Sequence, residues 1–229
     1  MNIAKRHQEI IDRVTNATDI ADKSLNDITI IAVCKRQPIE KIYRVYDLGY
    51  RHFGENTVQG LLNNAKLLID SGRTEAKWHY IGKLQRNKIN KIVTVSPLIH
   101  TIDSIKLASS LAERVTDSQR PINTLIQVNI DDERQKGGVK PSEVIELADF
   151  IAKQTTLKIT GLMCIPKIDG DRYASYQLMN QLFNELTEKP YGNTIITLSM
   201  GMSGDFETAI KANANCIRIG SALFGPRTT

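Results

Sequence analysis

The chain has few cysteines and no long hydrophobic run. Its three cysteines form no C-x-x-C pair and each lies in an apolar segment, which favours reduced, buried thiols over disulfides. The longest strongly apolar stretch, residues 28–34, is far shorter than the ~20 residues that span a bilayer. Residues 1–16 lack the apolar core of a secretory signal. We therefore expect a cytoplasmic protein with no membrane partner.

The composition also excludes disorder and collagen-like fibres, because 41% of the 229 residues are hydrophobic and 24% are charged. Basic residues exceed acidic ones by 30 to 25, which gives a net charge of +5 and is compatible with anionic partners. One basic segment has no interleaved aromatic side chains, so we expect no nucleic-acid partner. We interpret it as solvated surface or as a collar that attracts an anionic ligand: Lys83, Arg86, Lys88 and Lys91.

Eight short apolar segments rich in isoleucine and valine recur along the chain. Most of them do not alternate polar with apolar residues, which is typical of parallel strands covered on both faces. The segments are residues 28–35, 52–56, 78–82, 98–103, 123–130, 159–166, 194–201 and 216–224.

Helical patterns separate these segments. After Pro38, which suits the first turn of a helix, apolar residues recur on one face until Gly49, which can end a helix in the left-handed conformation. Eight strands alternating with helices predict a single domain, residues 1–229, folded as an α/β (β/α)₈ TIM barrel. Only four residues follow Gly225, so we expect the N-terminal segment to cover the place of an eighth helix. A doubly wound open sheet is the alternative fold.

Lys35 is the first candidate for chemistry. It ends an apolar strand on the same side as Ile31 and Val33, so its ammonium group is expected in the mouth of the barrel. A lysine in such a place can attack a carbonyl and form a Schiff base. The alternative is a lysine that begins a loop and reaches solvent.

Two loops rich in serine and glycine form the second candidate, at residues 198–205 and 218–221. Loops after the seventh and eighth strands of such barrels often bind phosphate through backbone N–H groups and hydroxyls. The alternative is that Ser203 caps the helix that contains Phe206.

Several distinct motifs resemble those of the pyridoxal 5′-phosphate homeostasis protein family, the single-domain relatives of the alanine racemase barrel. The resemblance covers about residues 28–225. It implies a barrel like the alanine racemase N-terminal domain, with pyridoxal 5′-phosphate held as an imine. It also implies a role in binding, buffering or delivering that cofactor without robust turnover. The motifs are Ala32–Lys35, His52–Asn56, Trp78–Gly82, Leu84–Gln85, Asn87–Lys88, Gly161–Met163, Ser199–Ser203 and Arg218–Gly220.

The resemblance assigns a role to each matching residue. Lys35 would be the Schiff-base lysine, Asn56 would lie beside the ring, and Arg218 would face the pyridine nitrogen. A permanently charged arginine there disfavours protonation of that nitrogen and weakens the ring as an electron sink, so we expect no enzyme activity. Partners would be pyridoxal phosphate and the apoenzymes that use it, and we expect a monomer. The phosphate would be surrounded by Ser199, Met202, Ser203, Gly220 and Ser221.

Three departures from the family pattern stand out. Cys34 occupies the place of a serine, and residues 135–138 read Gln-Lys-Gly-Gly instead of Ser-Lys-Ser-Gly. We expect Cys34 to be a small buried hydrophobe, although the adjacent cation could raise its reactivity. Asn213 replaces a glycine at the end of a helix, and we expect it to keep the left-handed cap.

Two enzymatic alternatives remain at this stage. A low-activity amino-acid racemase would need a second base opposite the lysine; Tyr80 and Tyr173 can be proposed, but tyrosines in strands and helices are more often core residues. A metal-dependent hydrolase is suggested by His52, His79 and His100 on successive strands. Two of these lie near the start of their strands, on the wrong side for a site in the barrel mouth, so we expect core histidines and no metal.

Overall fold

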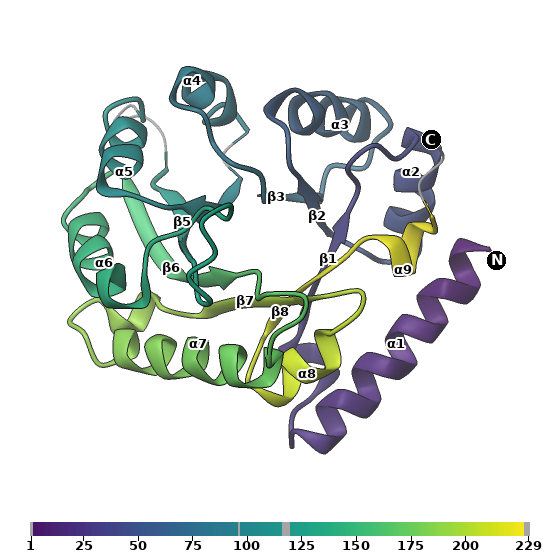
Figure 1. Ribbon diagram of the computed structural model, residues 1–229. Helices are drawn as coiled ribbons and strands as arrows, with labels where there is room; N and C mark the ends of the chain where they lie inside the picture. Colours follow the sequence, from purple (N-terminus) through teal and green to yellow (C-terminus); the bar gives the residue numbers. More distant parts are fainter. Residues whose placement is uncertain (1, 96, 116–119, 227–229) are drawn as a thin grey trace.

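Eight parallel strands close into a barrel in the computed structural model, which describes residues 2–95, 97–115 and 120–226 (Figure 1). Each strand pairs with the next in chain order, and the last pairs with the first, with Thr29 opposite Cys216. The predicted (β/α)₈ barrel is confirmed and the open sheet is wrong. The strands are β1 (Thr29–Val33), β2 (His52–Glu55), β3 (Lys77–Tyr80), β4 (Leu98–Ile102), β5 (Ile122–Val128), β6 (Leu157–Cys164), β7 (Thr197–Met202) and β8 (Cys216–Ile219).

Helices surround the barrel and cover the outer faces of its strands (Figure 1). Gly49 follows α2 with a φ of +100° and Asn213 follows α8 with a φ of +73°, so both end a helix as predicted. No helix in the described part of the chain is long and apolar enough to cross a membrane. The helices are α1 (Ile3–Ile20), α2 (Ile39–Asp47), α3 (Val58–Asp70), α4 (Ile89–Ile92), α5 (Ile105–Ala112), α6 (Val144–Ala152), α7 (Arg172–Thr187), α8 (Phe206–Lys211) and α9 (Ser221–Phe224).

The N-terminal helix α1 packs against α8 and α9, beside the last strand (Figure 1). It buries one apolar face through Ile10, Val14 and Ala17, each at most 2% exposed. The expectation that the N-terminal segment covers the barrel beside the last strand is confirmed.

The eighth strand is shorter than predicted. It ends at Ile219, whereas the apolar pattern predicted a strand through Phe224. The chain turns because the carbonyl of Gly220 accepts hydrogen bonds from the N–H groups of Leu223 and Phe224, which makes the single helical turn α9. Leu223 and Phe224 are therefore apolar because they are buried where α9 packs against α1, and not because they belong to the sheet.

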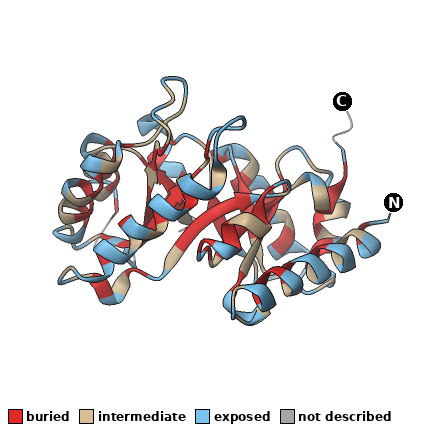
Figure 2. Ribbon diagram, turned by 60° about the horizontal axis from the view of Figure 1, so that its bottom comes forward, coloured by how far each residue is buried: buried red, intermediate tan, exposed pale blue. Residues whose placement is uncertain are grey.

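Apolar side chains form two separate clusters. The large one lies between the strands and the surrounding helices, which is why the strands in Figure 2 are buried while the helices are exposed on their outer faces. The small one lies inside the barrel and consists of Ile31, Val33 and Cys216, with Ile81 packed against it. Alternation along the strands separates the two sets. Much of the barrel interior is therefore left to polar side chains.

Candidate functional site

A cavity of about 470 Å³ opens where the strands end, on the carboxyl-terminal side of the barrel. Its lining comes from β1, β6, β7 and β8 and from loops that follow β1, β2, β3, β6, β7 and β8, which is where barrels of this kind place their functional groups. Seven of the eight residues predicted from the sequence lie around it: Lys35, Asn56, Met202, Ser203, Arg218, Gly220 and Ser221.

Lys35 stands at one wall of this cavity, two residues after the end of β1. It continues the inward alternation of Ile31 and Val33, both of which belong to the barrel interior. Its side chain is partly buried. The cavity therefore holds a primary amine that a bound carbonyl compound can reach.

Behind Lys35, the carboxylate of Glu55 is 3% exposed and accepts several hydrogen bonds. Its Oε1 accepts from Asn64 Nδ2 at 2.9 Å, and its Oε2 accepts from the N–H of Asn56 at 3.2 Å. Burial raises the pKa of Glu55, and these hydrogen bonds, together with the charge of Lys35, oppose that rise. The network ties the ends of β1 and β2 to α3.

Cys34 points into this network and away from the cavity. Its Sγ donates to the carbonyl oxygen of Gly54 at 3.4 Å and to Glu55 Oε1 at 3.5 Å. Burial and the neighbouring carboxylate raise the pKa of the Cys34 thiol well above its ordinary value. The structure therefore supports the buried hydrophobe, and not the reactive thiol.

The opposite wall is built from the two loops rich in serine and glycine. Ser203 Oγ accepts hydrogen bonds from the N–H groups of Gly220 at 3.2 Å and Ala222 at 3.3 Å, so it joins the β7 loop to the start of α9. A Cβ added to Gly204 would meet nothing within 4 Å, which leaves its backbone open to a ligand. This wall offers hydroxyls and backbone N–H groups at short range.

The alternative role for Ser203, as the cap of α8, is wrong. Asp205 is the N-cap residue of that helix, and its Oδ1 accepts from the N–H of Met202 at 2.6 Å. Asp205 also receives a hydrogen bond from Arg172 at 3.1 Å. The Ser203 hydroxyl is directed toward β8 instead, at the edge of the cavity.

Arg218 forms the floor of the cavity and is only 4% exposed. Its Nη1 donates to Ser199 Oγ at 2.7 Å and its Nη2 to the carbonyl oxygen of Cys164 at 2.8 Å. Ser199 is fully buried and does not line the cavity, because Arg218 lies between Ser199 and the cavity. The sequence placed Ser199 with the phosphate-binding loops, whereas in the structure its hydroxyl lies beneath these loops and accepts a hydrogen bond from Arg218.

The three histidines of the strands lie inside the barrel in one hydrogen-bonded row. His52 Nδ1 is 2.8 Å from His79 Nε2, and His79 Nδ1 is 2.9 Å from His100 Nε2. Burial lowers the pKa of His79 to about 3 and places that of His100 well below its ordinary value. Within the described residues, no group of three or more His, Cys, Asp or Glu side chains is arranged to hold a metal ion. The interpretation as core histidines is confirmed for His79 and His100, whereas His52 is partly exposed.

One wall of the cavity is apolar, and the sequence did not reveal it. It consists of Ile81, Met163 and Ile165, which offer a surface to the flat face of a ring. Gly82 is needed beside it, because a Cβ there would come within 2.0 Å of the carbonyl oxygen of Asn56. Alternation along β6 could have identified Met163, since it is followed two positions later by Ile165.

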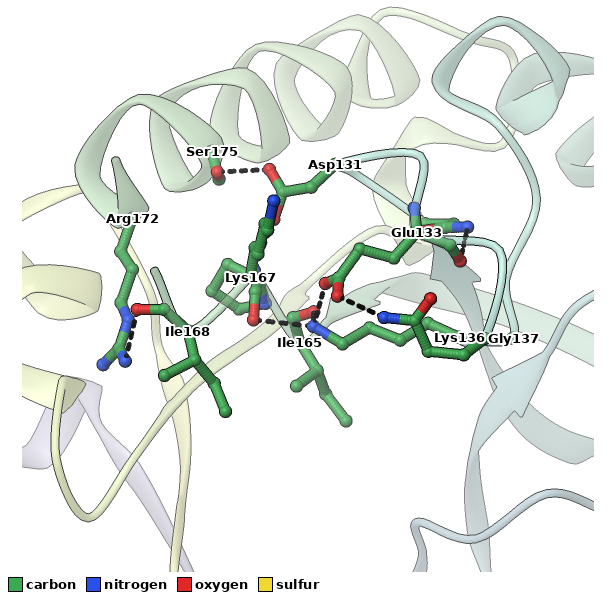
Figure 3. Close-up of polar contacts among 12 residues, drawn as sticks. Asp131, Glu133, Lys136, Gly137, Ile165, Lys167, Ile168, Arg172 and Ser175 are labelled. Atoms are coloured by element: carbon green, nitrogen blue, oxygen red, sulfur yellow. Dashed lines mark hydrogen bonds and ion pairs between the residues drawn. The ribbon is translucent and has the colours of Figure 1, made fainter. Parts of the chain in front are cut away.

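Lys136, from the segment that departs from the family pattern, braces this wall (Figure 3). Its Nζ donates to the carbonyl oxygens of Ile165 at 3.2 Å and Pro166 at 2.9 Å, and it forms an ion pair with Glu133. In the same cluster, Asp131 accepts from Ser175 Oγ at 2.6 Å. The Lys136 contacts fix the loop after β6 to the loop after β5 and so hold Ile165 at the cavity, and Asp131 ties the loop after β5 to α7.

Comparison with known proteins agrees with this geometry. The chain matches the family described as alanine racemase, N-terminal domain, over residues 12–228. It is 36% identical to the pyridoxal phosphate homeostasis protein of Escherichia coli strain K12 over 230 residues, which cover 99% of this chain and 97% of that protein. The chain belongs to the pyridoxal phosphate homeostasis protein family. The resemblance read from its motifs is thereby confirmed.

Solved structures extend the comparison. PipY of Synechococcus elongatus PCC7942, another protein similar to this chain, has a structure with PLP bound; it is 28% identical, with a TM-score of 0.79 over 93% of this chain and 100% of that chain. Alanine racemase of Corynebacterium glutamicum is 16% identical, with a TM-score of 0.69 over 96% of this chain and 62% of that chain. The latter likeness concerns the fold alone, and the racemase chain continues beyond the shared barrel.

Proposed function

We propose that this protein binds pyridoxal 5′-phosphate covalently at Lys35 and maintains the intracellular supply of that cofactor, without robust turnover of its own. One observation carries the proposal. A single cavity has an amine at one wall, hydroxyl and backbone donors at the other and a buried cation at its floor. An aldehyde, a phosphate and a pyridine nitrogen are the three groups that such a donor set suits. The family name and the PLP-bound PipY structure support the same ligand.

Each wall has a distinct task in this proposal. When bound, the cofactor supplies an aldehyde that condenses with an amine and a ring that withdraws electrons. Lys35 is the covalent anchor, and Asn56 lies beside the ring and its substituents. The apolar wall excludes water from the ring face. The phosphate is held by the loop residues Met202, Ser203, Gly220 and Ser221, and Ser199 supports Arg218 beneath them.

The absence of robust catalysis follows from Arg218 and from the cavity lining. A buried guanidinium disfavours a proton on the pyridine nitrogen, which limits the stabilisation of a carbanion. Among the described residues that line the cavity, Lys35 is the only amine, and no imidazole, carboxylate, thiol or phenol joins it. Tyr80 and Tyr173 do not line the cavity; Tyr80 donates to the carbonyl oxygen of Lys83, and Tyr173 is 44% exposed. This favours carriage of the cofactor over racemisation.

We further propose that residues 1–229 act as one cytoplasmic, monomeric barrel domain that exchanges pyridoxal phosphate with apoenzymes. The closed sheet and the packing of α1 against α8 and α9 support a single domain. Three free, buried cysteines suit a reducing compartment. The open mouth of the cavity suits exchange of a small ligand with solvent.

The central test is the visible absorbance of the purified protein incubated with pyridoxal phosphate, before and after borohydride reduction. We expect a band from the imine that borohydride removes, and we expect Lys35→Ala to lose the band completely. Mass spectrometry of the reduced protein should place the added mass on the peptide that contains Lys35. Amino-acid racemisation, followed in parallel by chiral chromatography, should stay at the level of the cofactor alone.

A matched control is Lys158→Ala, because Lys158 is exposed at the start of β6, at the opposite end of the barrel. It should retain the full band. Wild-type protein without a reducible band under excess cofactor would refute covalent binding, and a band retained in Lys35→Ala would move the anchor to another lysine.

A further inference from the structure

Three of the four histidines of this chain lie in one row across the inside of the barrel. The row continues from His100 Nδ1 to Ser199 Oγ at 3.1 Å, and from there to Arg218 Nη1 at 2.7 Å. Four consecutive hydrogen bonds thus connect β2, β3, β4, β7 and β8. They link the partly exposed ring of His52, near the amino-terminal end of the barrel, to the floor of the cavity.

Such a row is costly to bury. Barrel interiors are filled mainly by branched apolar side chains, and a buried imidazole is tolerated only when its nitrogens are hydrogen-bonded. His100 is fully buried and His79 is 4% exposed, and both ring nitrogens of each are paired. The interior apolar cluster contains only three described residues. The polar row therefore replaces core packing and calls for a function that core packing cannot supply.

The positions of the protons follow from one end of the row. A guanidinium can only donate, so Ser199 Oγ accepts from Arg218. The Ser199 proton has two neighbours, His100 Nδ1 and the Cys216 sulfur, and it points at His100 Nδ1 because an imidazole nitrogen is the stronger acceptor. His100 then carries its proton on Nε2 and donates to His79 Nδ1. His79 in turn donates from Nε2 to His52 Nδ1. All three rings are neutral Nε2–H tautomers in this arrangement.

The opposite arrangement also pairs every ring nitrogen, but it directs three N–H dipoles toward the positive charge of Arg218. At low dielectric that orientation is unfavourable, so the guanidinium selects the first one. Lys77 lies near His52 and His79 at the far end, where its charge opposes this choice, but Lys77 is exposed and screened by solvent whereas Arg218 is buried. The thiols of Cys216 and Cys164 stay protonated because burial raises their pKa values to about 11 and about 12, so they add no charge beside the row.

We propose that His52, His79, His100 and Ser199 form a hydrogen-bond relay, polarised by Arg218, that positions the Arg218 guanidinium at the floor of the cavity. The relay concentrates negative charge on Ser199 Oγ, because hydrogen bonds in a row strengthen one another. This holds Nη1 in place while Cys164 holds Nη2. The histidines are thus positioning residues. Their effect on a bound cofactor rests on the proposed function, whereas the relay itself does not.

The first test is ¹⁵N NMR of the histidine rings in the protein without added cofactor, at pH 7. We expect the rings of His52, His79 and His100 to be neutral, with a protonated Nε2 and an unprotonated Nδ1, and we expect scalar couplings across the hydrogen bonds between rings. A charged ring, or an Nδ1–H tautomer at His79 or His100, overturns the relay. This measurement uses the wild-type chain and does not depend on the folding of any variant.

Variants of the two end residues supply the second test. Ser199→Ala removes the donor at the end of the row, and Arg218→Met removes the charge that orients it, so each should give mixed tautomers at His79 and His100. Ser199→Thr keeps the hydroxyl and should restore the wild-type ring spectrum. Unchanged tautomers in both Ser199→Ala and Arg218→Met would show that neither residue orients the row and would overturn the proposal.

A cofactor readout separates the two proposals. If Arg218 is positioned by the relay, Ser199→Ala should shift the absorbance maximum of bound pyridoxal phosphate and the pH dependence of that band, and Ser199→Thr should reverse both shifts. A wild-type protein that shows the expected tautomers but no reducible band would refute the proposed function and leave the relay standing. A normal reducible band together with the opposite tautomers would refute the relay and leave the proposed function standing.

Discussion

At the scale of single residues, Glu55 illustrates how a buried charge can tie a site together. Its two oxygens accept hydrogen bonds from Asn64 and from the backbone of Asn56, and Cys34 donates weakly to it. Burial disfavours the charged form, so these donors decide whether the residue stabilises the fold. Because Asn56 lines the cavity, the same hydrogen bonds also fix one of its walls.

Glu55→Gln should therefore destabilise the protein. The amide of glutamine has one accepting oxygen, so it cannot accept from both Asn64 Nδ2 and the N–H of Asn56 unless the buried Asn64 amide turns over. We expect the free energy of unfolding to fall by about 1–3 kcal/mol, which is the cost of an unsatisfied buried donor. Urea unfolding measures it. The exposed Glu113→Gln is the control and should change the value by less than about 0.5 kcal/mol; a Glu55→Gln protein as stable as wild type would contradict this account.

Single residues of the site differ in how far the sequence revealed them. Lys35 was placed by alternation along β1, because a strand that is covered on both faces still sends every second side chain inward. Arg218 was placed by the family resemblance of its motif. Ser199 was placed on the correct strand, but its partner His100 is 99 residues away along the chain. No local pattern encodes that contact.

At the scale of elements, β6 depends on one glycine. Gly161 has a φ of +148°, and a Cβ added to it would lie 1.8 Å from the carbonyl oxygen of Thr197 on β7. The register between β5 and β6 also shifts at this point, between Thr124 and Leu125. The irregularity allows β6 to continue to Met163, which lines the cavity.

Gly161→Ala should separate β6 from β7 or distort the irregularity. We expect a loss of more than about 2 kcal/mol in the free energy of unfolding, since both the backbone conformation and the contact become unfavourable. Gly170→Ala, in the loop after β6, is the matched control, because its nearest neighbour would be an ordinary 3.4 Å away. Thermal unfolding of both variants measures the difference, and equal melting temperatures would contradict the requirement for glycine at position 161.

At the scale of the whole molecule, the buried histidines connect stability to pH. Burial is the main reason that the pKa values of His79 and His100 are lowered in the folded protein, whereas an unfolded histidine has a pKa of about 6.5. Below pH 6.5 the unfolded chain therefore binds more protons than the folded one. The contribution of these two neutral histidines to the free energy of unfolding is therefore complete above pH 6.5 and is lost as the pH falls below it.

We expect the free energy of unfolding to decrease by about 2 kcal/mol for each of these two histidines between pH 7 and pH 5, since each pH unit below 6.5 costs up to about 1.4 kcal/mol. Urea unfolding at pH 7, 6 and 5 measures the slope. His7, which lies on α1 outside the barrel, provides the control. His7→Gln should keep the slope, and a wild-type stability that does not change over this range would contradict neutral burial of the row.

The sequence by itself determined the barrel, the strand order and the inward direction of Lys35, because alternation, helix periodicity and the positions of proline, glycine and asparagine are local properties of the chain. It also carried the family motifs, and these placed Arg218 in the site. Only the tertiary structure decided that Ser203 joins the β7 loop to α9, that Ser199 lies under Arg218, and that three histidines from separate strands meet in one row. These are contacts between residues far apart in the sequence, and closure of the sheet is what brings them within hydrogen-bond distance.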